Sequence, residues 1–209
     1  YTRQYDSLAS LLALELPVVL VDRTIEGAPL PTVCSDNYSA AEGLVRLLAG
    51  GGAKRIAFLG GSMEYSTVYE RYQGYADTLK ALSLPVLPEL ILTGYRDRDE
   101  EGYRAMELLH QRGADAVFTE NSMLMLGVVL YCQQHGIRIP QDFSIAGFDN
   151  APWMQITSPT ITAVQQDAYT MGIKAANMLV SLIEKEEVPQ QDLLIPTDIV
   201  LRQSHNKNI

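Results

Sequence analysis

Short apolar runs alternate with longer amphipathic stretches along most of this chain. The apolar runs are rich in valine, isoleucine, leucine and phenylalanine and are bounded by glycine, proline or acidic residues, a pattern that predicts buried strands. Strands are predicted over residues 17–22, 54–61, 89–94, 114–120, 143–149, 160–164 and 198–203.

The stretches between these runs place apolar residues at helical spacing, as Val68, Tyr72, Tyr75 and Leu79 do. Several of them stop at glycines, which commonly end helices. Helices are predicted over residues 39–52, 67–82, 98–113, 122–136 and 168–187. Repeated alternation of nearly continuous apolar strands with helices predicts an α/β fold in which doubly wound parallel sheets are covered on both faces. Periodicity alone leaves open whether there are one or two sheets.

Four of the predicted strands finish in polar side chains. "VVLVD" ends in Asp22, "IAFLGGS" is followed on the next helix by Arg71, "AVFTEN" ends in Glu120 and Asn121, and "SIAGFDN" ends in Asp149. Ligands of open parallel sheets bind at the carboxyl ends of the strands. The joint placement of these groups therefore predicts one binding site.

Each residue also has a purely structural interpretation. Asp149 and Asn121 are both suited to cap the helix that follows them. Arg71 suits a surface ion pair, and Asp22 suits a turn. Only their common position at strand ends favours the binding interpretation.

The polar side chains at the strand ends limit the class of ligand that could bind there. Carboxylates and carboxamides suit vicinal hydroxyls, and an arginine fork grips two oxygens at once. The sequence contains neither GxxxxGK[ST] nor GxGxxG, which would bind phosphates. A neutral polyhydroxylated small molecule is therefore the predicted ligand. No GxSxG, HExxH or spaced Cys/His pair is present, so the sequence predicts no catalytic residues, no metal site, no cofactor and no enzyme activity.

Composition limits the partners and the compartment. The 16 basic and 25 acidic residues give a formal net charge of −9, which argues against nucleic-acid binding by this stretch alone. Two cysteines without metal-ligand spacing, no visible signal peptide and no long apolar segment predict a cytoplasmic chain that does not contact the membrane.

The motifs "PVVLVDR", "VCSDNYSAAEGLVRLLAGGGAKRIAFLGG", "ERYQGYADTLKALSLPV" and "RIPQDFSIAGFDN" resemble, in order and spacing, the effector domain of LacI/GalR-type transcriptional regulators. The resemblance implies a fold like that of type I periplasmic binding proteins, with two subdomains joined by crossover strands. It implies an incomplete N-terminal subdomain from residues 1–33 and 165–188, a C-terminal subdomain from 34–164 and 189–203, and a tail over 204–209. It also implies a helix at the start of the chain.

The resemblance further implies effector contacts at Asp22, Arg71, Asn121 and Asp149. Tyr95 is expected to stack on a sugar, and Cys34 matches a position that lines the cleft in relatives. The chain departs from the family's pattern where Ser122 and Asn150 replace acids and where Ala168 replaces a larger residue. These departures put the identity of the effector in question.

By resemblance, the expected function is effector sensing by a repressor through a shift between conformations, within a homodimer. Operator DNA would be bound only through a helix-turn-helix module that lies outside these residues. Three alternatives remain at this point: a periplasmic sugar-binding protein of the same fold, an enzyme on a related scaffold, and an interaction module without a ligand.

Overall fold

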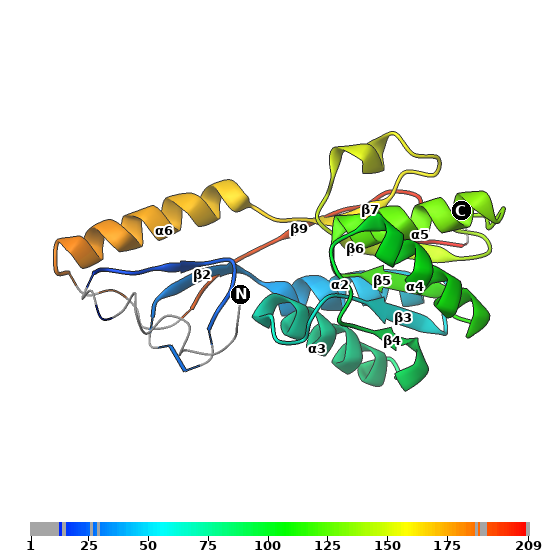
Figure 1. Cartoon of the computed structure of the whole chain (residues 1–209), viewed down its shortest axis with the longest axis horizontal. Helices are drawn as coiled ribbons and strands as arrows, with labels where there is room; N and C mark the ends of the chain where they lie inside the picture. The colour runs from blue at the N-terminus through cyan, green and yellow to red at the C-terminus, as the bar shows by residue number, and fades with distance from the viewer. Residues whose placement is uncertain are drawn as a thin grey trace.

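The computed structural model describes residues 13, 16–25, 27–28, 30–186, 188 and 192–207. They form two sheets at opposite ends of an elongated molecule (Figure 1). The helix expected at the start of the chain lies outside the described residues. No helix in the described ranges is long and apolar enough to cross a membrane.

The larger sheet has six strands in the order β4-β3-β5-β6-β7-β9. All neighbours are parallel except β7 and β9, which are antiparallel. The strands are β3 (Ile56–Leu59), β4 (Ile91–Leu92), β5 (Ala116–Thr119), β6 (Ser144–Phe148), β7 (Thr162–Gln165) and β9 (Asp198–Val200). The central strands β3, β5 and β6 are buried along their whole length, as their continuous apolar sequences predict.

Helices cover both faces of this sheet. On one face, α2 (Asn37–Gly50) and α3 (Ser66–Ala81) enclose a core of packed aromatic rings from Phe58, Tyr75 and Phe118. On the other face, α4 (Asp99–Gln111) and α5 (Ser122–Gln134) pack against the sheet through a mainly aliphatic core. The prediction of a doubly wound α/β fold is confirmed.

The smaller sheet has the order β1-β2-β8, formed by β1 (Leu20–Val21), β2 (Thr32–Ser35) and β8 (Leu193–Ile195), and all its neighbours are parallel. Helix α6 (Ala168–Ile183) packs on it through Met171, Ala175 and Met178. The chain passes between the two sheets three times, from β2 to α2, from β7 to α6 and from β8 to β9 (Figure 1).

The predicted subdomain boundaries need correction at two of these passages. Cys34 and Ser35 belong to the smaller sheet, and so does β8, because their backbone groups pair with one another. Strand β9, in the same predicted range 189–203 as β8, instead pairs with β7 of the larger sheet. The strand pairs, which join residues far apart in the sequence, decide the boundary.

The predicted tail at 204–209 also differs from the structure in its described part, residues 204–207. Ser204 is fully buried, where its Oγ donates to Ile145 O at 2.7 Å and accepts from Thr162 N at 2.9 Å. His205 is 9% exposed and its Nδ1 lies 2.8 Å from Thr162 Oγ1. Residues 204 and 205 are held in place because they provide hydrogen-bond partners for backbone and side-chain groups of β6 and β7.

Candidate functional site

A cavity of about 410 Å³ lies where the carboxyl ends of β1, β3, β5 and β6 meet. Five of the six residues predicted from the sequence line it, which are Asp22, Arg71, Tyr95, Asn121 and Asp149. The other lining residues are Arg23, Gly61, Ser62, Tyr65, Thr67, Val68, Gly94, Arg96, Asp97, Glu120 and Gln166. The cavity therefore has walls from both sheets and from the crossover between β7 and α6.

Asp22 and Asp149 share an unusual backbone conformation. Their φ angles are 75° and 66°, in the left-handed region that few non-glycine residues adopt. Each residue directly follows a strand, so the left-handed turn redirects the chain at the edge of the sheet. Strained positions of this kind concentrate at ligand sites, and aspartate tolerates the conformation better than most residues.

Arg71 is 4% exposed and is held by three groups. Its Nε donates to Asn37 Oδ1 at 2.8 Å, and its Nη1 donates to Glu120 O at 2.6 Å. Its guanidinium carbon lies 3.7 Å from the centre of the Phe148 ring. Within the described chain, Nη2 has no hydrogen-bond partner, so this nitrogen is available to a ligand in the cavity.

Glu120 is 5% exposed and forms an ion pair with Arg71, with 3.2 Å between Nη1 and Oε2. Burial raises the pKa of the Glu120 carboxyl, and the neighbouring Arg71 opposes this rise. Its other oxygen, Oε1, accepts from Gly61 N at 3.1 Å and from Asn121 Nδ2 at 2.8 Å. Glu120 thus ties the ends of β3 and β5 to helix α3.

Asn121 serves as the N-cap of α5, since its Oδ1 accepts from Leu124 N at 2.9 Å. Its Nδ2 donates to Asp97 Oδ1 and to Glu120 Oε1, both at 2.8 Å. Both amide hydrogens are therefore used within the protein. The capping interpretation of Asn121 is correct, and the side chain also lines the cavity.

Asp149 does not cap the following turn. Its Oδ1 accepts from Gln166 Nε2 at 2.6 Å, and Gln166 Oε1 in turn accepts from Ser35 Oγ at 2.8 Å. These bonds join the end of β6 to two of the three passages between the sheets. In the part of the chain that the structure describes, Asp149 Oδ2 has no partner and remains an acceptor facing the cavity.

The smaller sheet contributes the opposite wall. Asp22 Oδ2 pairs with Arg23 Nε at 3.2 Å, and the Arg23 guanidinium lies 4.4 Å from the centre of the Tyr65 ring. Thr24 N donates to Ser66 Oγ at 3.0 Å, at the first residue of α3. The loop after β1 is therefore in direct contact with the amino end of α3 across the cavity.

Tyr95 lines the cavity from the loop after β4 and is half-buried. Cys34 does not line it, because this residue is 2% exposed within β2, where burial raises the thiol pKa to about 12. Sequence reasoning did not select Gln166 or Asp97 as site residues. It placed Glu120 among the polar groups at strand ends but did not include it among the predicted ligand contacts.

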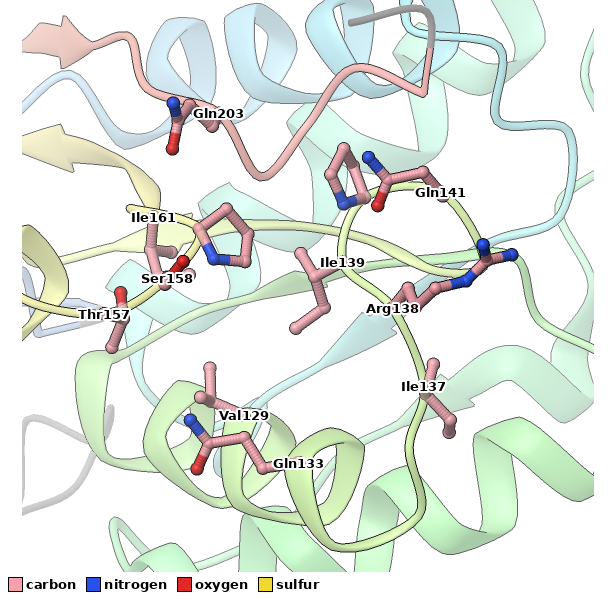
Figure 2. A pocket seen from close by; sticks show the side chains of 12 residues that line it. Val129, Gln133, Ile137, Arg138, Ile139, Gln141, Thr157, Ser158, Ile161 and Gln203 are labelled. Carbon is pink, nitrogen blue, oxygen red and sulfur yellow. The ribbon is translucent and has the colours of Figure 1, made fainter.

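A second cavity of about 460 Å³ lies at the other end of the larger sheet, before β6 and β7 (Figure 2). Ile139 and Ile161 form part of its wall, with Gln133 on α5 and Gln203 on the opposite side. Its single charged lining residue, Arg138, is paired with Asp142, with 2.6 Å between Nη2 and Oδ1. Charged groups that follow strands of both sheets converge in the first cavity, which we take as the candidate site. No group of three His, Cys, Asp or Glu side chains in the described ranges is arranged to hold a metal ion.

Comparisons with known proteins agree with this geometry. A family model described as a periplasmic binding protein-like domain matches residues 45–205. The HTH-type transcriptional repressor CytR from Escherichia coli is 30% identical over 190 residues, which make up 90% of this chain and 55% of that protein. The chain spans little more than half the length of such curated relatives, and covers 57% of the repressor PurR from Histophilus somni.

Two solved structures have the same fold. The transcription regulator CcpA of Lactococcus lactis superposes with a TM-score of 0.88 at 31% identity, over 94% of this chain and 72% of that one. The transcriptional regulator CelR in complex with cellobiose superposes with a TM-score of 0.88 at 27% identity, over 96% and 63% of the two chains.

Proposed function

This chain belongs to the LacI family of transcriptional regulators and carries its periplasmic binding protein-like effector domain, and we propose that it senses a neutral polyhydroxylated small molecule, a sugar or a sugar derivative such as a nucleoside. The proposed contacts are those of Asp22, Arg71, Asn121, Asp149 and Tyr95 with the ligand. Cys34 is left out of this set because the side chain is enclosed in β2.

The observation that carries the proposal is a pair of unpartnered groups on the cavity wall. Asp149 Oδ2 is an unused acceptor and Arg71 Nη2 an unused donor, while the remaining polar atoms of both side chains are held by the protein. A rigid donor and a rigid acceptor facing one space suit the hydroxyl groups of a sugar. The bound cellobiose of the relative CelR supports this choice of ligand class.

The two-sided lining supports a regulatory role. A ligand that contacts Asp22 on one wall and Asp149 on the other binds most tightly when the two walls are close together. Such a ligand shifts the population towards that arrangement, because only a differential affinity for two states moves the equilibrium between them. In this proposal, the population shift is transmitted through a homodimer to DNA-binding segments outside these residues. This role is supported by the relatives named above, which are transcriptional regulators.

A ligand screen on the complete protein tests this function. Thermal unfolding is followed with a panel of neutral mono- and disaccharides and nucleosides. A ligand present at one hundred times its Kd is expected to stabilise the native state by about 2.7 kcal/mol. The bound ligand is then expected to change the affinity for operator DNA selected from genomic fragments. A ligand that binds without changing operator affinity contradicts the regulatory part, and failure of the whole panel contradicts the sensing part.

A further inference from the structure

Glu120 is a buried carboxylate whose oxygens are all turned towards the protein. The two oxygens of its side chain accept from the backbone Gly61 N and from the side-chain atoms Asn121 Nδ2 and Arg71 Nη1, so all three partners are donors. A protonated carboxyl would have to donate its own hydrogen, so three donors on two oxygens fit the ionised form. Glu120 is therefore a fixed negative charge beside Arg71.

The glycines at the end of β3 make room for this carboxylate. A Cβ atom on Gly60 would lie 2.8 Å from Glu120 Cγ, and one on Gly61 would lie 3.2 Å from Glu120 Oε1. The wall between β3 and β5 is thus shaped around the Glu120 side chain.

The charged groups that line the cavity carry no net positive charge. Four carboxylates, from Asp22, Asp97, Glu120 and Asp149, face three guanidinium groups, from Arg23, Arg71 and Arg96. The amino ends of α3 and α5 each add about half a positive charge, which brings the lining close to neutrality. A phosphate group carries nearly two negative charges and needs an excess of positive groups to replace its hydration.

We propose that Glu120 determines the charge of the ligand: by compensating Arg71, it allows the cavity to bind a neutral hydroxylated ligand and to exclude the phosphorylated form of the same compound. This inference rests on the proposed sensing function. Arg71 then acts as a hydrogen-bond donor through Nη2 without supplying net charge. Glu120 is a positioning residue, because its contacts are with Arg71, Asn121 and Gly61.

Matched pairs of ligands test the inference on the complete protein. Isothermal titration calorimetry is carried out with glucose and glucose 6-phosphate, ribose and ribose 5-phosphate, and cytidine and cytidine monophosphate. At least one neutral member is expected to bind, and its phosphorylated partner is expected to bind at least tenfold more weakly. Equal or tighter binding of the phosphorylated member overturns the inference and leaves the sensing function intact. A neutral ligand found only in the larger panel described above is compared with its own phosphate in the same way. Absence of binding by every compound of that panel and of these pairs overturns both.

The variant Glu120→Gln keeps the shape of the side chain and removes its charge. The ratio of the two dissociation constants is expected to shift by about tenfold or more in favour of the phosphorylated ligand, since one unit charge near the site changes its electrostatic energy by that order. Glu42→Gln is the matched control, because Glu42 lies on the outer side of α2 in an exposed pair with Arg46. An unchanged ratio in a folded Glu120→Gln protein, verified by circular dichroism, overturns the role of Glu120. The ratio of the two dissociation constants in the unmodified protein tests the predicted exclusion of the phosphorylated ligand even if this variant does not fold.

Discussion

Asn37 Oδ1 accepts a 2.8 Å hydrogen bond from Arg71 Nε, which joins the first turn of α2 to the middle of α3. The same amide donates from Nδ2 to Ser35 O at 3.1 Å and to Glu70 Oε2 at 2.9 Å. Ser35 is the last residue of β2, where the chain leaves the smaller sheet. The orientation of the arginine in the cavity is therefore coupled to the passage between the two sheets.

Asn37→Ala is expected to destabilise the native state by about 1–3 kcal/mol, because it leaves the buried guanidinium of Arg71 and the partly buried carboxylate of Glu70 without their partner. Ligand affinity is also expected to fall, since the guanidinium loses one of its supports. Urea unfolding and calorimetry measure the two effects. Tyr38→Phe is the control on the adjacent residue, as it removes only an exposed hydroxyl contact with Asp77. Full stability of Asn37→Ala would contradict the coupling described above.

Asp149→Asn is expected to weaken ligand binding at least tenfold with little change in stability. Asparagine tolerates the left-handed backbone at φ 66° and keeps an oxygen for Gln166, but it places no charge at the acceptor that faces the cavity. Asp149→Ala is expected to lose about a further 1 kcal/mol of stability from backbone strain. Calorimetry and urea unfolding of the two variants separate these effects, with Asp77→Asn on the outer surface of α3 as control. Unchanged affinity in Asp149→Asn removes this residue from the site.

Gly60→Ala is expected to destabilise the protein by about 1–3 kcal/mol, because the added Cβ meets both Glu120 Cγ and the Phe58 ring at 2.8 Å. Gly50→Ala, at the end of α2, is the matched control, since nothing lies within 4 Å of its added Cβ. The control is expected to be neutral or more stable by a few tenths of a kcal/mol. Equal unfolding midpoints for the two variants would show that the contact between Gly60 and Glu120 is not tightly packed.

His205 is expected to make stability dependent on pH. Burial lowers the pKa of its imidazole in the native state, so below the unfolded value of about 6.5 the unfolded chain binds more protons. The contribution of His205 is therefore fully present at neutral pH and declines as the pH falls below about 6.5. Urea unfolding of the unmodified protein and of His205→Gln at pH 7.5 and 5.5 measures this contribution. A loss on acidification that is equally large in both proteins contradicts the prediction.

Much of the larger sheet and its helices was predictable from the sequence, because its strands lie in apolar runs bounded by glycine, proline or acidic residues and its helices are long enough for their periodicity to appear. The strands β2 and β8 were not predicted: β2 begins and ends in the polar residues Thr32 and Ser35, and β8 is a run of only three apolar residues. Local chemistry likewise predicted the polar groups at strand ends, and five of the six residues chosen on that basis and by resemblance line one cavity.

By itself, the sequence determined the α/β class, the order of the elements and the kinds of side chain at the carboxyl ends of the strands, because these depend on residues close together in the chain. Only the tertiary structure decided that Arg71 is compensated by Glu120, 49 positions away, and that Ser35 is joined to Gln166, 131 positions away. It also placed Cys34 within β2 and buried His205 in the predicted tail. Such pairings depend on which strands lie side by side and on which backbone groups need partners, and these are properties of the folded chain.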